Sequence, residues 1–114
     1  MRTIYISIPI TGYDINERIE AAERLRERLL ADGWAVYSPL HKSSVPLDSP
    51  REIHMREDIK LLLKSDAIFM AGDWQESRGC VLEREVAKQC GLQVIYELEI
   101  DRNYYGKYDK QGGD

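Results

Sequence analysis

The sequence predicts a three-layer α/β/α fold, in which a parallel sheet of about four strands has helices on both faces. Two observations predict the layers: four short apolar segments with the composition of strands alternate with longer segments of helical periodicity, and glycine or proline stands near several of the boundaries. The length of 114 residues suits one domain with a single core. A strand–helix–strand alternation of this kind gives parallel strands with helical crossovers.

The first strand is predicted over residues 3–8, where three isoleucines alternate with Tyr5 and Ser7. This period of two places the isoleucines on one side of the strand and the two hydroxyl side chains on the other. Pro9 and Gly12 then mark a turn.

The first helix is predicted from about Ile15 to Ala31, with Asp14 as the residue that caps it. Apolar residues form one stripe along it, and the opposite face is filled with Glu and Arg. The stripe consists of Ile15, Ile19, Ala22, Leu25 and Leu29. Gly33 ends the helix, and residues 34–38 form the second strand.

Residues 39–49 are predicted to be a loop, because prolines and serines interrupt any regular pattern. A loop of this length in a small domain is often a binding loop. His41 and Lys42 can meet an anionic or polar ligand there, and they fit a solvated surface loop equally well.

The second helix is predicted to start with Ser49 as its cap, Pro50 at its first position and Glu52 completing a capping box. It should run to about Lys64. Asp58 lies where the apolar part of this helix begins, so its carboxylate either caps a group or touches a ligand.

The third strand is predicted over the apolar residues 67–71, and the fourth over residues 93–97. Between them a helix begins after Ser77, its predicted cap, and stops at Gly91. Glu83 lies inside this helix among apolar neighbours. Since ligands of open α/β sheets bind where strands hand over to helices, Glu83 is the strongest candidate for chemistry in the chain.

The composition limits the function classes. The chain has 16 basic and 20 acidic side chains and a net charge of −4, which argues against binding a nucleic acid polymer. No apolar run is long enough to span a bilayer, and the start is not that of a signal peptide. Cys80 and Cys90 lie about 15 Å apart along one helix, too far to bridge each other. We therefore expect a cytoplasmic protein with reduced thiols.

No metal site and no cofactor are predicted. His41 and His54 lack nearby ligands with the spacing of a zinc site. The chain contains neither a phosphate-binding P-loop nor a GxGxxG fingerprint.

The domain is predicted to cover residues 1–100, followed by a tail at 101–114. The tail carries Tyr104, Tyr105 and Tyr108. We expect it to be partly disordered or to lie at a subunit interface, where tyrosine is favoured.

The order and spacing of four segments resemble those of the nucleoside 2-deoxyribosyltransferase superfamily, most closely its short, often phage-borne members. The resemblance covers about the first 97 residues and implies the flavodoxin-like or Rossmann-like version of the fold. The segments are residues 4–12, residues 55–58 leading to 66–68, the turn 72–79 and the helix 80–91.

The resemblance implies an enzyme that cleaves an N-glycosidic bond. The glutamate matching Glu83 is the family's nucleophile, which attacks the anomeric carbon of a 2′-deoxynucleoside and forms a glycosyl ester. The aspartate matching Asp58 interacts with the base and manages its proton. The first loop, with Ser7, Pro9 and Thr11, would form the floor of the pocket.

The turn before the third helix is predicted to complete the substrate site. By the resemblance it contributes Asp73, Ser77 and Gly79, while Trp74 either stacks on a base or belongs to the core or surface. One departure from the family stands here: members usually carry an aspartate six residues before the nucleophile, and this chain has Ser77. Members that act on nucleoside monophosphates hold the phosphate with serine and backbone amides, which Ser77 and Ser7 would fit.

Three interpretations of this site follow. The first is a 2-deoxyribosyltransferase or a deoxynucleoside (monophosphate) N-hydrolase, whose partners are small nucleosides or nucleotides. The second is a module that binds or senses nucleotides without catalysis. In the third, Glu83 only pairs with an arginine such as Arg56 or Arg78. The resemblance also implies a homo-oligomer, a dimer or larger, in which neighbouring chains complete each pocket.

Overall fold

Four parallel strands form one sheet in the order β2-β1-β3-β4. The computed structural model describes residues 1–41, 45–46 and 48–97, so the predicted role of Lys42 and the predicted tail lie outside the described residues. The strands are β1 (Thr3–Ser7), β2 (Ala35–Tyr37), β3 (Ala67–Met70) and β4 (Gln93–Tyr96). Strand β1 pairs with both β2 and β3, so it lies inside the sheet.

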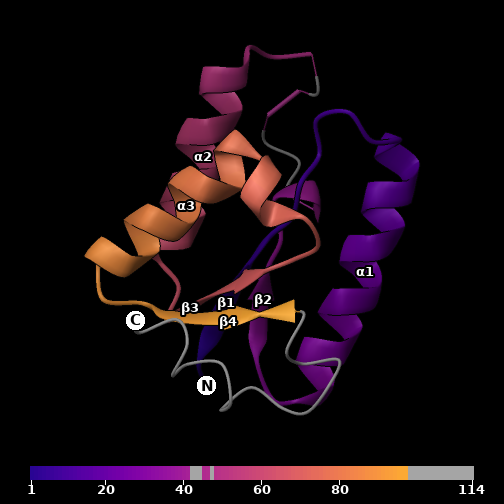
Figure 1. Ribbon diagram of the computed structural model, residues 1–114. Coiled ribbons are helices and arrows are strands. Elements are labelled where there is room, and N and C mark those ends of the chain that lie inside the picture. Colours follow the sequence, from indigo (N-terminus) through magenta and orange to yellow (C-terminus); the bar gives the residue numbers. More distant parts are fainter. Residues whose placement is uncertain (42–44, 47, 98–114) are drawn as a thin grey trace.

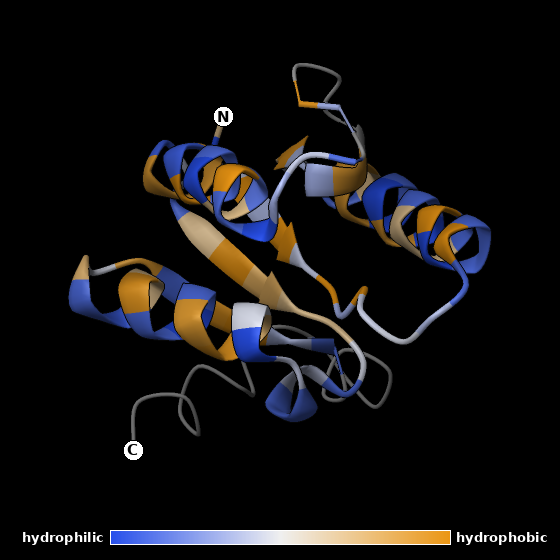
Figure 2. Cartoon of the chain, turned by 90° about the horizontal axis from the view of Figure 1, so that it is seen from above, coloured by the Kyte–Doolittle hydropathy of each residue, from blue (hydrophilic) through white to orange (hydrophobic). Residues whose placement is uncertain are grey.

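The helices cover both faces of this sheet. They are α1 (Ile15–Ala31), α2 (Arg51–Leu63) and α3 (Arg78–Gln89), with short 3-10 turns η1 (Pro39–His41) and η2 (Trp74–Glu76). Helix α1 lies on one side, and α2 and α3 lie together on the other (Figures 1 and 2). This is the three-layer α/β/α fold that the sequence predicts, and the prediction is confirmed.

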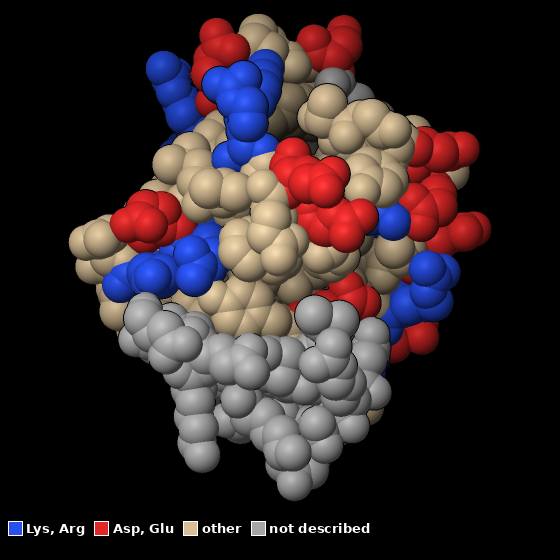
Figure 3. Space-filling model, viewed as in Figure 1, with Lys and Arg blue, Asp and Glu red and all other residues tan. Residues whose placement is uncertain are grey.

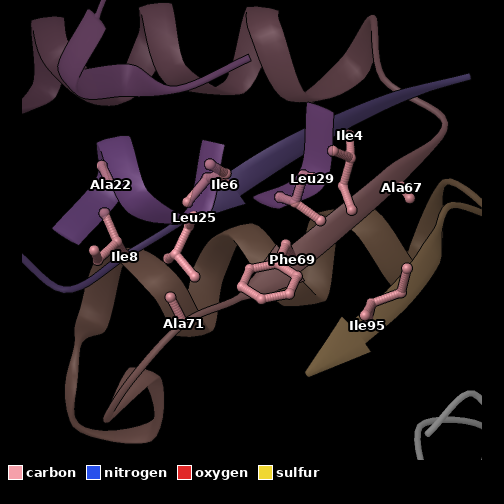
Figure 4. Close-up of a cluster of buried hydrophobic side chains, with 10 residues drawn as sticks. All are labelled: Ile4, Ile6, Ile8, Ala22, Leu25, Leu29, Ala67, Phe69, Ala71 and Ile95. Carbon is pink, nitrogen blue, oxygen red and sulfur yellow. The ribbon is translucent and has the colours of Figure 1, made fainter. Parts of the chain in front are cut away.

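The alternation along β1 separates two cores. The isoleucines at positions 4, 6 and 8 face α1 and pack with Leu29 and Phe69 (Figure 4). Tyr5 lies in the second cluster, which is shared with side chains of α2 and α3 such as Leu62 and Cys80. The predicted period of two therefore decides which side chains of β1 can reach each helical layer.

Two of the predicted core positions on α1 are wrong. Ala22, Leu25 and Leu29 are buried, whereas Ile15 and Ile19 are each 37% exposed. The reason is geometric: the first turns of α1 extend past the carboxyl ends of the strands, where no sheet covers them (Figure 1).

The predicted start of α2 also differs. Pro50 is the N-cap and no side chain caps the helix, so the capping box from Ser49 is absent. The backbone N–H of Ser49 instead donates to the carbonyl of Pro46 (3.0 Å), which keeps Ser49 in the preceding turn. The predicted loop begins with the turn η1, and the fixed φ of a proline suits the first residue of a helical turn.

The predicted cap of α1 forms, and its contribution to the free energy of unfolding can be measured. The carboxylate of Asp14 accepts a hydrogen bond from the backbone N–H of Asn16 (2.8 Å). We expect Asp14→Ala to lower the free energy of unfolding by about 1 kcal/mol, because an amide of the first turn loses its partner. Denaturant unfolding measures this. Asp14→Asn is the matched control, since asparagine caps equally well and should retain wild-type stability.

In the part of the chain that the structure describes, none of the helices has the length and apolar character needed to cross a bilayer. On the face shown in Figure 3, acidic and basic side chains are interspersed.

Candidate active site

Glu83 is a buried carboxylate whose two oxygens have separate hydroxyl donors. Its side chain comes from α3 and the residue is only 5% exposed. Tyr5 Oη donates to Glu83 Oε2 (2.7 Å), and Ser7 Oγ donates to Glu83 Oε1 (2.6 Å). Hydrogen bonds to an ionised carboxylate are short and stronger than neutral ones. The pair of donors therefore fixes the carboxylate in one orientation.

The two donors reach Glu83 because they are alternate residues of β1. Residues two apart on a strand point to the same face. Tyr5 and Ser7 thus both point toward the layer of α2 and α3, and both are completely buried. Residue Ser7 is the last of β1, so the site lies at the carboxyl edge of the sheet, where ligands of open α/β sheets bind.

Asp58 contributes its charge to the same group. The pKa of Tyr5 is raised well above its ordinary value, first by burial and then by the negative charges of Glu83 and Asp58. The two acids predicted to converge therefore both act on the Tyr5 hydroxyl. Asp58 itself comes from α2 and is half-buried.

This raised pKa has a consequence for stability at high pH. Above about pH 10 the unfolded chain releases the proton of Tyr5 while the folded chain retains it. The unfolded state then binds fewer protons, so this one group lowers the stability as the pH rises above that value.

We expect Tyr5→Phe to remove that contribution, which makes the alkaline loss of stability less steep. The measurement is the free energy of unfolding at several pH values between about 9 and 11. Tyr13→Phe is the matched control, because Tyr13 is 42% exposed. Equal slopes in Tyr5→Phe and wild type would contradict the buried, proton-retaining hydroxyl.

Ser77 and Cys80 lie at the start of α3, where the Cys80 thiol contacts the hydroxyl of Ser7. Ser77 Oγ accepts the backbone N–H of Cys80 (3.2 Å), so Ser77 is the N-cap of α3 as predicted. Burial raises the pKa of the Cys80 thiol, while hydrogen bonds with the hydroxyls of Ser7 and Ser77 oppose that rise. Cys80 therefore connects Ser77 with Ser7, one of the two hydroxyl donors to Glu83.

Gly79 lets α3 approach α2 closely. A Cβ atom at this position would lie 3.2 Å from the Cε atom of Met55 and 4.0 Å from Ser77 Oγ. The absence of a side chain at Gly79 thus keeps space between Met55 and the start of α3.

The remaining predicted residues have other surroundings. Trp74 packs with Tyr96 (5.7 Å between ring centroids) and lies under the guanidinium of Arg84 (5.1 Å). Its ring is thus occupied by protein partners, which favours the core interpretation over the base-stacking one. Asp73 and Thr11 are exposed, and Pro9 is buried.

Sequence reasoning missed Tyr5 and Cys80 as members of the site. The signal for Tyr5 was present, because it shares its strand face with Ser7. Cys80 lies three residues before Glu83, so the helical repeat places both on one side of α3. Arg56 and Arg78, the proposed partners of Glu83, are both exposed.

Among the described residues, no group of three His, Cys, Asp or Glu side chains could hold a metal ion.

A search of curated protein sequences finds no match. A 2-deoxyribosyltransferase from Bacillus psychrosaccharolyticus has a similar structure, with a TM-score of 0.60 and 22% identity, over 82% of this chain and 70% of that one. A conserved protein from Enterococcus faecalis V583 is similar with a TM-score of 0.63 and 20% identity, over 84% of this chain and 62% of that one.

These likenesses concern the fold. They confirm the predicted resemblance to the 2-deoxyribosyltransferase superfamily at that level. The model of one protein family, a domain of unknown function (DUF4406), matches residues 2–96 and so includes every described strand and helix. The chain therefore belongs to the DUF4406 family and has the α/β fold of a 2-deoxyribosyltransferase.

Proposed function

We propose that this protein cleaves the N-glycosidic bond of a 2′-deoxynucleoside or its monophosphate, with Glu83 as the nucleophile. The observation that carries the proposal is the buried carboxylate of Glu83, held by the hydroxyls of Tyr5 and Ser7 at the carboxyl edge of the sheet. The fold of a 2-deoxyribosyltransferase supports it. A carboxylate suits this reaction because it can trap an oxocarbenium-like centre covalently.

In the first step, a carboxylate oxygen of Glu83 forms a bond to the anomeric carbon. The bond from that carbon to the base nitrogen breaks, and its electron pair leaves with the base. The hydrogen bonds from Tyr5 and Ser7 hold the carboxylate in one orientation. The carboxylate therefore has little orientational freedom left to lose on reaching the transition state. In the second step, water or another base displaces the sugar from Glu83.

Asp58 is the proposed proton donor to the departing base. Its charge acts on the Tyr5 hydroxyl, which supports a position near the same reacting centre. A general acid must reach the ring nitrogen within hydrogen-bond distance or through one water. Asp58 comes from α2 and Glu83 from α3, so the base would lie between the two helices.

The substrate site in this proposal includes Ser7, Pro9, Thr11, Asp73, Ser77 and Gly79, with Ser77 holding a sugar hydroxyl or a phosphate. We further propose a cytoplasmic homo-oligomer, since neighbouring chains complete each pocket in the enzymes that the sequence resembles.

The test is incubation of the protein with each deoxynucleoside and each deoxynucleoside monophosphate, with chromatographic detection of free base. We expect release of base from at least one of them, and base exchange when a second base is added if the enzyme is a transferase. No release from any of them would overturn the proposal.

A non-catalytic nucleotide-binding module is the second candidate. Glu83 is only 5% exposed, which favours this candidate. The resemblance adds a second reason, because Ser77 takes the place of the aspartate that it implies. This candidate predicts thermal stabilisation by nucleotides without release of base.

A further inference from the structure

The face of the sheet opposite Glu83 carries a separate cavity. Its volume is about 420 Å³, within the range of small-molecule sites. It lies between α1 and the residues that follow β1 and β3, with an apolar floor that includes Ile8, Leu25 and Ala71. These three side chains belong to the core cluster of α1, whereas Tyr5 belongs to the cluster of α2 and α3. The sheet therefore separates this cavity from the carboxylate site.

Three arginines of α1 line this cavity. Arg18, Arg24 and Arg28 lie along the side of α1 that faces it, and Glu97 is the acid among the described lining residues. The Glu97 carboxylate accepts the backbone N–H of Gly72 (2.7 Å), which holds the carboxylate against the edge of the sheet. The described lining thus holds three guanidinium groups and one carboxylate, in a chain whose net charge is −4.

Arg18 is held by two neighbouring side chains. Its guanidinium donates twice to Glu17 (2.7 Å each) and lies over the ring of Tyr13 (4.4 Å). The charge of Glu17 offsets part of the charge of Arg18. Arg24 and Arg28 are exposed and extend the positive side of the cavity.

We propose that this cavity is an anion site that binds a phosphoryl group. Guanidinium groups recognise phosphate through paired hydrogen bonds, and they stay charged at any physiological pH. The position at the carboxyl ends of parallel strands is where such sheets bind ligands. The apolar floor adds a surface for the body of an organic phosphate, so the source is either a free phosphate ion or a phosphorylated small molecule.

The test is isothermal titration of the full chain with inorganic pyrophosphate and, in a second arm, with a deoxynucleoside monophosphate. Both arms use wild type, Arg24→Ala and Arg26→Ala. Arg26 is the matched control, because it lies on the same helix outside the described lining and pairs with Glu23 (3.6 Å). Both arms are repeated in Glu83→Gln, which separates binding here from binding at the carboxylate site.

We expect Arg24→Ala to weaken binding about tenfold, the worth of one charge-assisted hydrogen bond, and Arg26→Ala to change it less than about twofold. The Arg24 effect should be the same in the Glu83→Gln background. Arg24-dependent binding of pyrophosphate indicates that the phosphoryl group alone suffices, and such binding of the nucleotide only indicates an organic phosphate. No binding in either arm, or equal losses in Arg24→Ala and Arg26→Ala, would overturn the proposal.

Discussion

Glu83→Gln is expected to reduce the rate of base release by at least about a thousandfold, which is the scale of losing a nucleophile whose role no other group can take. Glutamine keeps the shape of the side chain, and its carbonyl oxygen still accepts a hydrogen bond from Tyr5 or Ser7. The fold should therefore persist while the bond to the sugar carbon can no longer form. The measurement is single-turnover release of base, with far-UV circular dichroism to verify folding.

Glu85→Gln is the matched control for this variant. Glu85 lies two residues further along α3, is exposed, and accepts a hydrogen bond from Gln89 (2.8 Å). Glu85→Gln removes the same charge from the same helix as Glu83→Gln does, but the Glu85 side chain points away from Tyr5 and Ser7. We expect activity within about twofold of wild type, since surface substitutions rarely disturb a distant site. Equal activity of Glu83→Gln and Glu85→Gln would mean that Glu83 is structural.

Leu62→Ala is expected to lower the free energy of unfolding by about 2–5 kcal/mol, because truncating a fully buried leucine loses its transfer energy and leaves a cavity. Leu62 is 0% exposed and packs α2 against the second core cluster, which also contains Tyr5. A loss of this size is a large share of the total stability of a small domain. Denaturant unfolding monitored by circular dichroism measures it.

The next residue along α2 supplies the control. Leu63 is 53% exposed, so Leu63→Ala should change the free energy of unfolding by no more than about 0.5 kcal/mol. The apolar part of this helix that begins at Asp58 contains both leucines, but only Leu62 is buried. A helix presents only one side to the sheet, so adjacent residues cannot both face the core. Equal losses in the two variants would contradict the observed rotation of α2.

The fold could be predicted because local patterns carry it. The alternation along β1, the cap at Asp14 and the left-handed glycine at Gly91 (φ +80°) are read from neighbouring residues, and each is found. The start of α2 could not be predicted this way. Ser49 has the right residue type, but its backbone N–H bonds to Pro46, a contact made by the preceding turn.

The site could be predicted only in part, since it joins residues distant in sequence. Glu83 and Ser7 are 76 positions apart, and their hydrogen bond depends on how α3 packs on β1. The environment of Trp74 depends likewise on Arg84 and Tyr96, which reach it from α3 and β4. In the sequence, the arginines of α1 fit a solvated helix face. Only the structure shows that they lie beside the edge of the sheet and line a cavity.

The most direct test of the proposed chemistry is intact-protein mass spectrometry after brief mixing with a deoxynucleoside or monophosphate that releases base. If Glu83 is the nucleophile, the protein transiently gains the mass of one deoxyribosyl group, or its phosphate ester, mapped by peptide digestion to Glu83 and absent in Glu83→Gln. A sugar adduct on another residue, or release of base that proceeds unchanged in Glu83→Gln, would contradict it.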